Sequence, residues 1–145
     1  MSMTSGLNAE DRARSAAMSR WLGASSALGA MALGCAAVLI FGCMLQTWRG
    51  DAVAVVLLVL VLSPVERYLA LRLRFDAGLF ADLADGRIAD LAALDAGLAM
   101  LGVRNAPQRP RTLDDRLAGS RRLWRFHAVV VALMAVGTGV AVVFA

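Results

Sequence analysis

Three apolar stretches alternate with charged segments along the chain. The first runs from Trp21 to Gln46 without a charged residue, and the last, from Phe126 to Ala145, also contains no charged side chain. A helix of about 20 apolar residues crosses a hydrocarbon core about 30 Å thick. The pattern therefore predicts transmembrane helices over 21–46 and 126–145.

The middle apolar stretch, Ala52 to Val65, is shorter, and a run of its length is also compatible with a re-entrant segment. Ser63 and Glu66 have the spacing of a capping box around Pro64, so a new helix beginning here is a second possibility. The third is one spanning helix over 52–71 that is kinked at Pro64. We favour the third, because an even number of crossings before Glu66 places the basic segments on the same side of the membrane.

The arginines predict the orientation, because short cytoplasmic segments carry an excess of basic residues. All fifteen basic residues are arginine: three lie before residue 21, one lies in 47–51 and eleven lie in 66–125. Three crossings with a cytoplasmic N-terminus place fourteen of them inside. This predicts a cytoplasmic tail over 1–20, an external loop over 47–51, a cytoplasmic helical segment over 72–125 and an external C-terminus. Arginine without lysine is typical of a GC-rich bacterial genome, so the expected location is a bacterial inner membrane.

Aromatic and basic residues mark the ends of the apolar stretches. Each of the three tryptophans lies next to an arginine at such a boundary. Tryptophan and arginine are the usual anchors at a membrane interface. We predict interface anchors at Trp21, Trp48, Trp124, Arg121, Arg122 and Arg125.

The segment between the second and third spans predicts three helices separated by two breaks. Apolar residues three or four positions apart mark faces of the first two helices, which end near Gly86 and Gly102. The first face comprises Tyr68, Leu71, Phe75, Leu79 and Leu83 and is widened by Leu69, Leu73 and Phe80. The second comprises Ile88, Leu91, Leu94, Leu98 and Leu101. A proline-containing loop follows over 103–111. Thr112 then caps a third helix, which continues without a break into the last span.

Small residues recur at multiples of four on the first and third spans. Stripes of this kind let two helix backbones approach closely in lipid. We predict helix packing through Ser26, Ala30, Gly34 and Gly42 on the first span and through Gly137 and Ala141 on the third. The pattern leaves open whether the contact lies within the chain, between copies or with another protein.

Few residues are suited to catalysis. The chain has one histidine, one tyrosine and two cysteines. His127 lies just inside the third span, where an ionisable group is a functional candidate, although near the interface an imidazole also reaches water. Cys35 and Cys43 lie about 12 Å apart along one helix, which is too far for a disulfide. We therefore expect no catalytic residue, metal or cofactor, and His127 is the one candidate ionisable site.

The composition agrees with a membrane protein. The chain is 59% hydrophobic and 18% charged, with a mean hydropathy of +0.66, whereas soluble domains average about 45–50% apolar and about 25% charged. The net charge of +4 is explained by orientation, so we expect no nucleic-acid partner. The expected fold is an all-α integral membrane protein with three transmembrane helices and a cytoplasmic helical segment between the second and third.

The expected function follows from this fold and from the lack of catalytic groups. We expect a small non-enzymatic accessory, assembly or scaffold subunit that docks on a larger membrane complex. Its partners would be the lipid bilayer and other membrane subunits or copies of itself, with no small-molecule substrate. The alternative is a small homo-oligomeric pore or channel of the holin-like kind.

Overall fold

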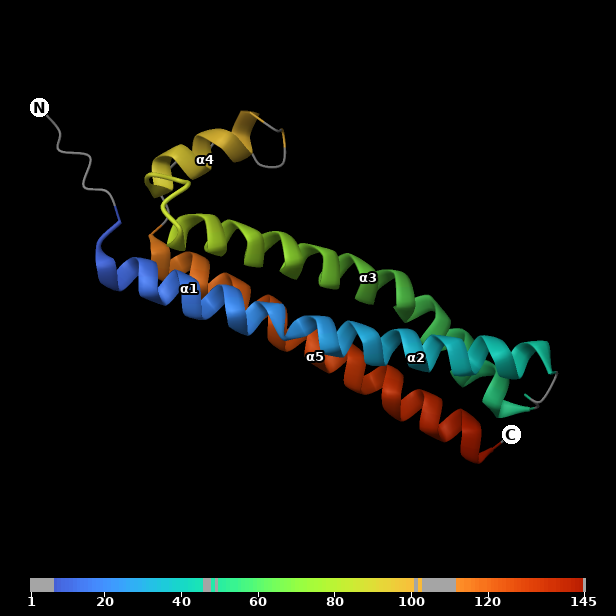
Figure 1. The fold of residues 1–145 in the computed structure, drawn as a ribbon. Helices are drawn as coiled ribbons and strands as arrows, with labels where there is room; N and C mark the ends of the chain where they lie inside the picture. The colour runs from blue at the N-terminus through green and yellow to red at the C-terminus, as the bar shows by residue number, and fades with distance from the viewer. Residues whose placement is uncertain (1–6, 46–47, 49, 101, 103–111, 145) are drawn as a thin grey trace, which may run out of the picture. The chain divides into compact units, whose positions relative to one another are not determined.

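The computed structural model describes residues 7–45, 48, 50–100, 102 and 112–144 (Figure 1). Every regular element in these ranges is an α-helix: α1 (Ala9–Gly23), α2 (Ser25–Met44), α3 (Asp51–Ala84), α4 (Leu91–Met100) and α5 (Leu113–Val143). Three helical stretches, Ala9–Met44, Ala52–Ala84 and Leu113–Val143, are long and apolar enough to cross a membrane. The all-α class and the three helices of spanning length are therefore confirmed, and they support a membrane location.

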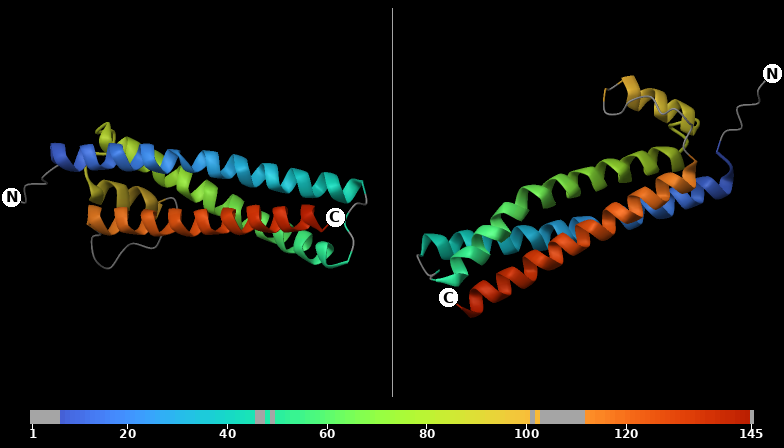
Figure 2. Two further views of the ribbon diagram at one scale, coloured as in Figure 1. Left: turned by 90° about the horizontal axis from the view of Figure 1, so that it is seen from below. Right: turned by 180° about the vertical axis from the view of Figure 1, so that it is seen from behind.

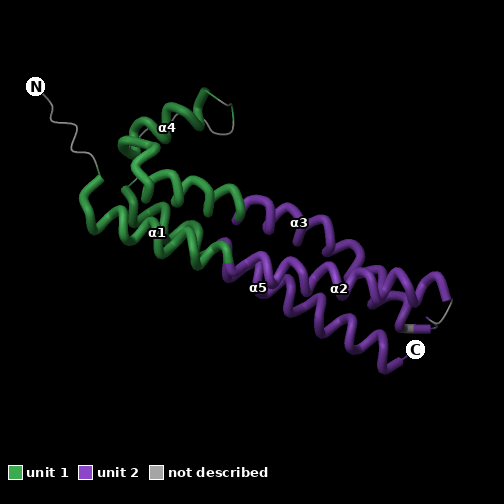
Figure 3. Tube along the Cα trace, in the orientation of Figure 1, with its two compact units in different colours: residues 1–23, 74–122 green, residues 24–73, 123–145 purple. Residues whose placement is uncertain are grey.

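The chain divides into two compact units (Figure 3). Unit 1 comprises residues 1–23 and 74–122, and unit 2 comprises residues 24–73 and 123–145. Within unit 2, α2 and parts of α3 and α5 run alongside one another (Figure 2). Their inward faces form an apolar core of Ala32, Leu39, Val56, Val59, Leu69, Val130, Val131, Met134 and Ala141.

The N-terminal segment contains a helix that the hydropathy pattern did not predict. The Asn8 side chain caps α1, because its Oδ1 accepts a hydrogen bond of 2.7 Å from the backbone N–H of Asp11. Ser15, Met18 and Leu22 are buried on one face of this helix. The segment over 1–20, expected as a tail, is therefore helical from Ala9 onward; its apolar face is too short to stand out in the sequence.

The α3 helix continues without interruption through Pro64. Ser63 does not cap a new helix there, because its hydroxyl donates to the Val59 carbonyl one turn earlier, at 3.1 Å. The helix extends to Ala84, so the expected boundary at residue 71 is not a helix end. A single helix through Pro64 is thus correct, and its complete crossing of a membrane stays a prediction.

The buried face of α3 coincides with only part of the broad apolar face predicted for it. Leu69, Leu73, Phe80 and Leu83 belong to the predicted face and are buried. Tyr68, Leu71 and Phe75 were also expected on it, but all three are exposed. The prediction was too wide, because apolar residues at helical spacing cover more of this helix than the core does.

The turn after α3 forms where glycine was expected to end the helix. Gly86 has a φ of +72°, a conformation that favours glycine. The next helix begins only at Leu91, because the Asp90 carboxylate accepts a hydrogen bond of 2.7 Å from the N–H of Ala93 and caps it. Ile88, which was predicted to belong to this helix, therefore precedes it. The predicted loop over 103–111 lies outside the described residues.

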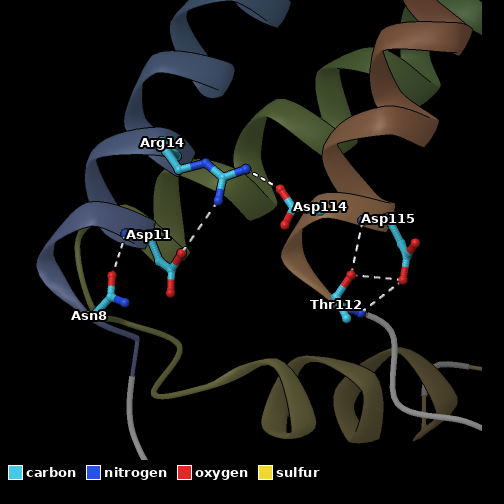
Figure 4. Close-up of polar contacts among 6 residues, drawn as sticks. All are labelled: Asn8, Asp11, Arg14, Thr112, Asp114 and Asp115. Carbon is cyan, nitrogen blue, oxygen red and sulfur yellow. Dashed lines mark hydrogen bonds and ion pairs between the residues drawn. The ribbon is translucent and has the colours of Figure 1, made fainter.

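A predicted cap begins α5 (Figure 4). The Thr112 hydroxyl accepts a hydrogen bond of 3.2 Å from the N–H of Asp115 and donates one of 2.8 Å to its carboxylate. The same carboxylate accepts a bond of 3.2 Å from the N–H of Thr112. This reciprocal arrangement is a capping box. The capping role of Thr112 is confirmed, as is the continuous helix from this cap into the last span.

Charge pairs connect the helices of unit 1. Arg14 on α1 donates a hydrogen bond to Asp114 on α5 and lies 3.8 Å from Asp11 (Figure 4). The hydrogen bond and the charge of Asp114 raise the pKa of Arg14 above its ordinary value, so this guanidinium stays charged. A second pair, Arg116 on α5 and Asp95 on α4, has an N–O distance of 2.6 Å and is largely buried.

Candidate functional site

The spacing of inward positions on α3 places a carboxylate inside unit 2. Val59, Leu69 and Leu73 are buried on α3, and Glu66 lies between them at the same helical spacing. Its side chain is only 1% exposed. A buried carboxylate in apolar surroundings is costly unless charged or hydrogen-bonding groups satisfy it. The partners of Glu66 therefore define the site.

The first partner is His127 on α5. Its side chain is fully buried, and its Nε2 lies 3.0 Å from Oε1 of Glu66. The expectation that the imidazole reaches water near the interface is wrong, because the inward face of α5 carries this residue into the core beside Val130 and Val131. His127 thus links α5 to α3.

The second partner is Arg67, the neighbour of Glu66 in sequence. Its Nε donates to Oε2 of Glu66 at 2.7 Å, and its Nη2 donates to the backbone carbonyl of Gly29 on α2, also at 2.7 Å. The arginine side chain is about half exposed. The α2 backbone lies next to the pair, since a Cβ at Gly29 would be in ordinary van der Waals contact with Oε1 of Glu66, at 3.6 Å. The cluster therefore joins three helices.

The contact between His127 and Glu66 holds one proton, because Nε2 and Oε1 are 3.0 Å apart. Nδ1 of His127 has no hydrogen-bond partner among the described residues. A proton on Nδ1 would make it a buried donor without an acceptor. An unprotonated Nδ1 is a buried acceptor without a donor, which costs less free energy. The tautomer that fits the site carries its proton on Nε2 and donates it to Glu66.

The arrangement is suited to clamping helices. It combines a charge-assisted hydrogen bond from α5 with a backbone contact to α2, and α3 carries the carboxylate and the guanidinium that make them. Among the described residues, no group of three or more histidine, cysteine, aspartate or glutamate side chains could hold a metal ion. Cys35 and Cys43 are free thiols on α2.

The predicted packing residues of the first span fall on different sides of α2. Ser26, Ala30 and Gly34 are exposed, and a Cβ at Gly34 would meet nothing within 4 Å. Gly42 is buried, and a Cβ there would collide with the indole of Trp48. The space beside Gly34 is therefore open, and the predicted packing role of this exposed side of α2 stays a prediction.

The predicted packing residues of the third span face inward. Ala141 is fully buried on α5. A Cβ at Gly137 would lie 2.7 Å from Cγ2 of Val59, so α5 and α3 approach closely where the side chain is missing. Here the small-residue pattern coincides with a contact between helices of the same chain.

The predicted interface anchors are partly or fully accessible. Trp21, Arg121, Arg122 and Arg125 are exposed, and Trp124 is half-buried. The indole N–H of Trp48 donates to the Leu39 carbonyl at 3.0 Å, so its polar group is used within the chain. Their roles as membrane anchors stay predictions.

Sequence reasoning identified His127 but missed its partner Glu66. The available signal was the position of Glu66 around the helix. It is seven residues after Val59 and seven before Leu73, so it lies on the same face as these core residues. It is also the one acidic residue between Ala52 and Phe75. An acidic residue on a core stripe and a histidine on a neighbouring span would have predicted the pair.

Comparisons with known proteins give no identification. No family model, curated protein or solved structure matches the chain. Its function is therefore inferred from the residues described above.

Proposed function

We propose that this chain is a small non-enzymatic membrane protein that acts as an accessory, assembly or scaffold subunit. It docks through its spanning helices on a larger membrane complex or on copies of itself. The observation that carries this proposal is the exposed small-residue face of α2, which consists of Ser26, Ala30 and Gly34.

This face is suited to contact with another helix. Lipid chains are as apolar as leucine, so helices associate in membranes where small residues permit close backbone approach. A Cβ at Gly34 would meet nothing within 4 Å, so the space beside it is open to a neighbouring molecule. The buried cluster of Glu66, Arg67 and His127 complements this role, because it links α2, which carries the face, to α3 and α5.

A homo-oligomeric pore is the alternative, and the placement of polar groups argues against it. A water-filled lumen needs polar side chains on outward faces that meet between copies. Glu66 and His127 are paired inside unit 2. Ser63 and Thr138 donate their hydroxyl hydrogens to Val59 and Met134 carbonyls on their own helices. These polar groups are already satisfied without a lumen.

Association is tested by changing the exposed glycine. Gly34→Ile adds a branched side chain where a partner backbone would lie, and it leaves the contacts within the chain intact. A helix contact worth about 0.6–2 kcal/mol gives a loss of association of about threefold to thirtyfold. Leu33→Ile is the matched control, because Leu33 is exposed on the same helix.

The measurement is crosslinking at matched expression, together with purification of the full chain in mild detergent. A discrete stoichiometric partner or homo-oligomer that Gly34→Ile weakens supports the scaffold proposal. Equal behaviour of Gly34→Ile and Leu33→Ile overturns the assignment of this face. Homo-oligomers that release dye from vesicles overturn the scaffold proposal in favour of the pore.

The proposed location is a bacterial inner membrane, with the N-terminus and residues 72–125 in the cytoplasm and the C-terminus outside. The distribution of the fifteen arginines supports this orientation. Reporter fusions at residues 50, 100 and 145 are expected to be external, internal and external, respectively. An external reporter at 100 would contradict the three-span topology, and an internal one at 145 would remove the last crossing.

A further inference from the structure

Three exposed arginines on α5 have no carboxylate partner among the described residues. Arg121, Arg122 and Arg125 are exposed and make no hydrogen bond or ion pair with any of them. By contrast, Arg14 and Arg116 bind carboxylates of other helices in unit 1. The three guanidinium groups are therefore available to a ligand.

The local charge on this helix is strongly positive. The two acidic residues of α5, Asp114 and Asp115, lie in its first turn. Asp114 binds Arg14, and Asp115 belongs to the capping box with Thr112. After Asp115 the helix contains no acidic residue, so nothing on α5 neutralises the three arginines.

The arginines lie directly beyond an outward apolar stripe. Phe126, Val129 and Leu133 are 53%, 55% and 56% exposed and follow Arg122 at steps of four, three and four residues. At 1.5 Å per residue, Arg122 lies about 6 Å along the helix axis from Phe126. In the proposed membrane location, on which this inference rests, the apolar stripe contacts acyl chains and ends in basic side chains at the depth of lipid headgroups.

We propose that Arg121, Arg122 and Arg125 form a binding site for the phosphate groups of anionic phospholipids. Guanidinium groups bind phosphate oxygens through paired, charge-assisted hydrogen bonds. Arg121 and Arg125 are four residues apart and so lie on one side of the helix, with Arg122 beside them. The apolar stripe accommodates the acyl chains of the same lipid, which a free phosphate ion lacks.

The test measures lipids retained by the full chain. The protein is released from mild detergent, with phosphatidylglycerol and phosphatidylcholine of equal chain length supplied together, and bound lipids are counted by native mass spectrometry. The wild type should retain phosphatidylglycerol in preference. Each arginine near an anionic surface strengthens binding about fivefold, so Arg122→Gln with Arg125→Gln should reduce this preference at least tenfold.

The matched control is Arg12→Gln with Arg74→Gln, which removes two exposed charges from α1 and α3 and gives the same net charge. It should keep the preference, and all variants should keep their helical circular dichroism. An equal loss in the control, or a wild type without preference, overturns the proposal.

Two further measurements distinguish an anionic lipid from other ligands of the three arginines. Displacement of phosphatidylglycerol by millimolar inorganic phosphate would assign the arginines to a free anion and overturn the lipid site. An acidic protein whose co-purification depends on Arg122 and Arg125, with lipid retention unchanged, would overturn it as well. Gly34→Ile should leave lipid retention unaltered, so the outcome is independent of the proposed docking face.

Discussion

Removal of Glu66 should destabilise the chain more than removal of His127, although the two side chains contact each other. Glu66→Leu leaves the Nε2–H of His127 without an acceptor and takes the carboxylate from Arg67. His127→Leu removes one donor, and Glu66 keeps its bond to Arg67. The carboxylate is therefore the central group of the cluster, and the imidazole is a terminal one.

The contacts set the size of these effects. A hydrogen bond to a charged group contributes about 1.5–3 kcal/mol in water-soluble proteins, whereas interhelical hydrogen bonds in membranes average about 0.6 kcal/mol and reach about 1.7 kcal/mol. The side chain of Arg67 is 46% exposed, so its loss of a partner adds only about 0–1 kcal/mol. We expect a loss of about 2–3 kcal/mol for Glu66→Leu and about 1–2 kcal/mol for His127→Leu. The double variant should lose about 1 kcal/mol less than the sum of the two single losses. Each single substitution leaves the other side chain without its partner, and the double variant contains neither side chain.

The assay is reversible unfolding of the full chain by SDS in mixed bicelles, followed by the fluorescence of its three tryptophans. Val65→Leu and Val129→Leu are matched controls at exposed positions near the two residues. They should change the free energy of unfolding by less than about 0.5 kcal/mol. Additive effects of the two leucine substitutions, or a larger loss for His127→Leu than for Glu66→Leu, would refute the reasoning.

Two further substitutions test local contacts with the same unfolding assay. Gly42→Ala should cost about 1–3 kcal/mol, because the new methyl group must displace the Trp48 indole; Gly34→Ala should be close to neutral, and equal effects of the two would contradict the packing. Thr112→Val should cost about 1 kcal/mol, because it removes the hydroxyl of the α5 cap; a cost below about 0.3 kcal/mol would show that the cap contributes little.

Local signals in the sequence predicted the helices and several of their ends. Thr112 with Asp115 three residues later specifies a cap through short-range hydrogen bonds, and Gly86 supplies a conformation that other residues resist. Such features depend on neighbours within one turn, so they are readable without tertiary structure. The overlooked α1 is the exception, because its buried face has only three residues.

The direction in which each helix faces was much less predictable. Small residues occur on every side of α2, so Ser25 and Gly29 turn inward while Ser26 and Ala30 turn outward with the same spacing. The polar cluster was missed for a related reason. Contact between Glu66 and His127 depends on the rotation of two helices whose residues are 61 positions apart, and periodicity within one helix does not fix that rotation.

On the proposed three-span topology, the order in which the polar contacts become available matters for insertion of the chain during synthesis. Arg67 is adjacent to Glu66, Gly29 is 38 residues before Arg67, and His127 follows Glu66 by 61 residues. A carboxylate entering a bilayer alone carries a cost of about 2.5–3.5 kcal/mol. Here the arginine accompanies it from the moment the segment is made, and the helix that supplies the Gly29 carbonyl is already present. The histidine arrives last, so on the proposed topology the cluster is completed only when the final helix joins the first two.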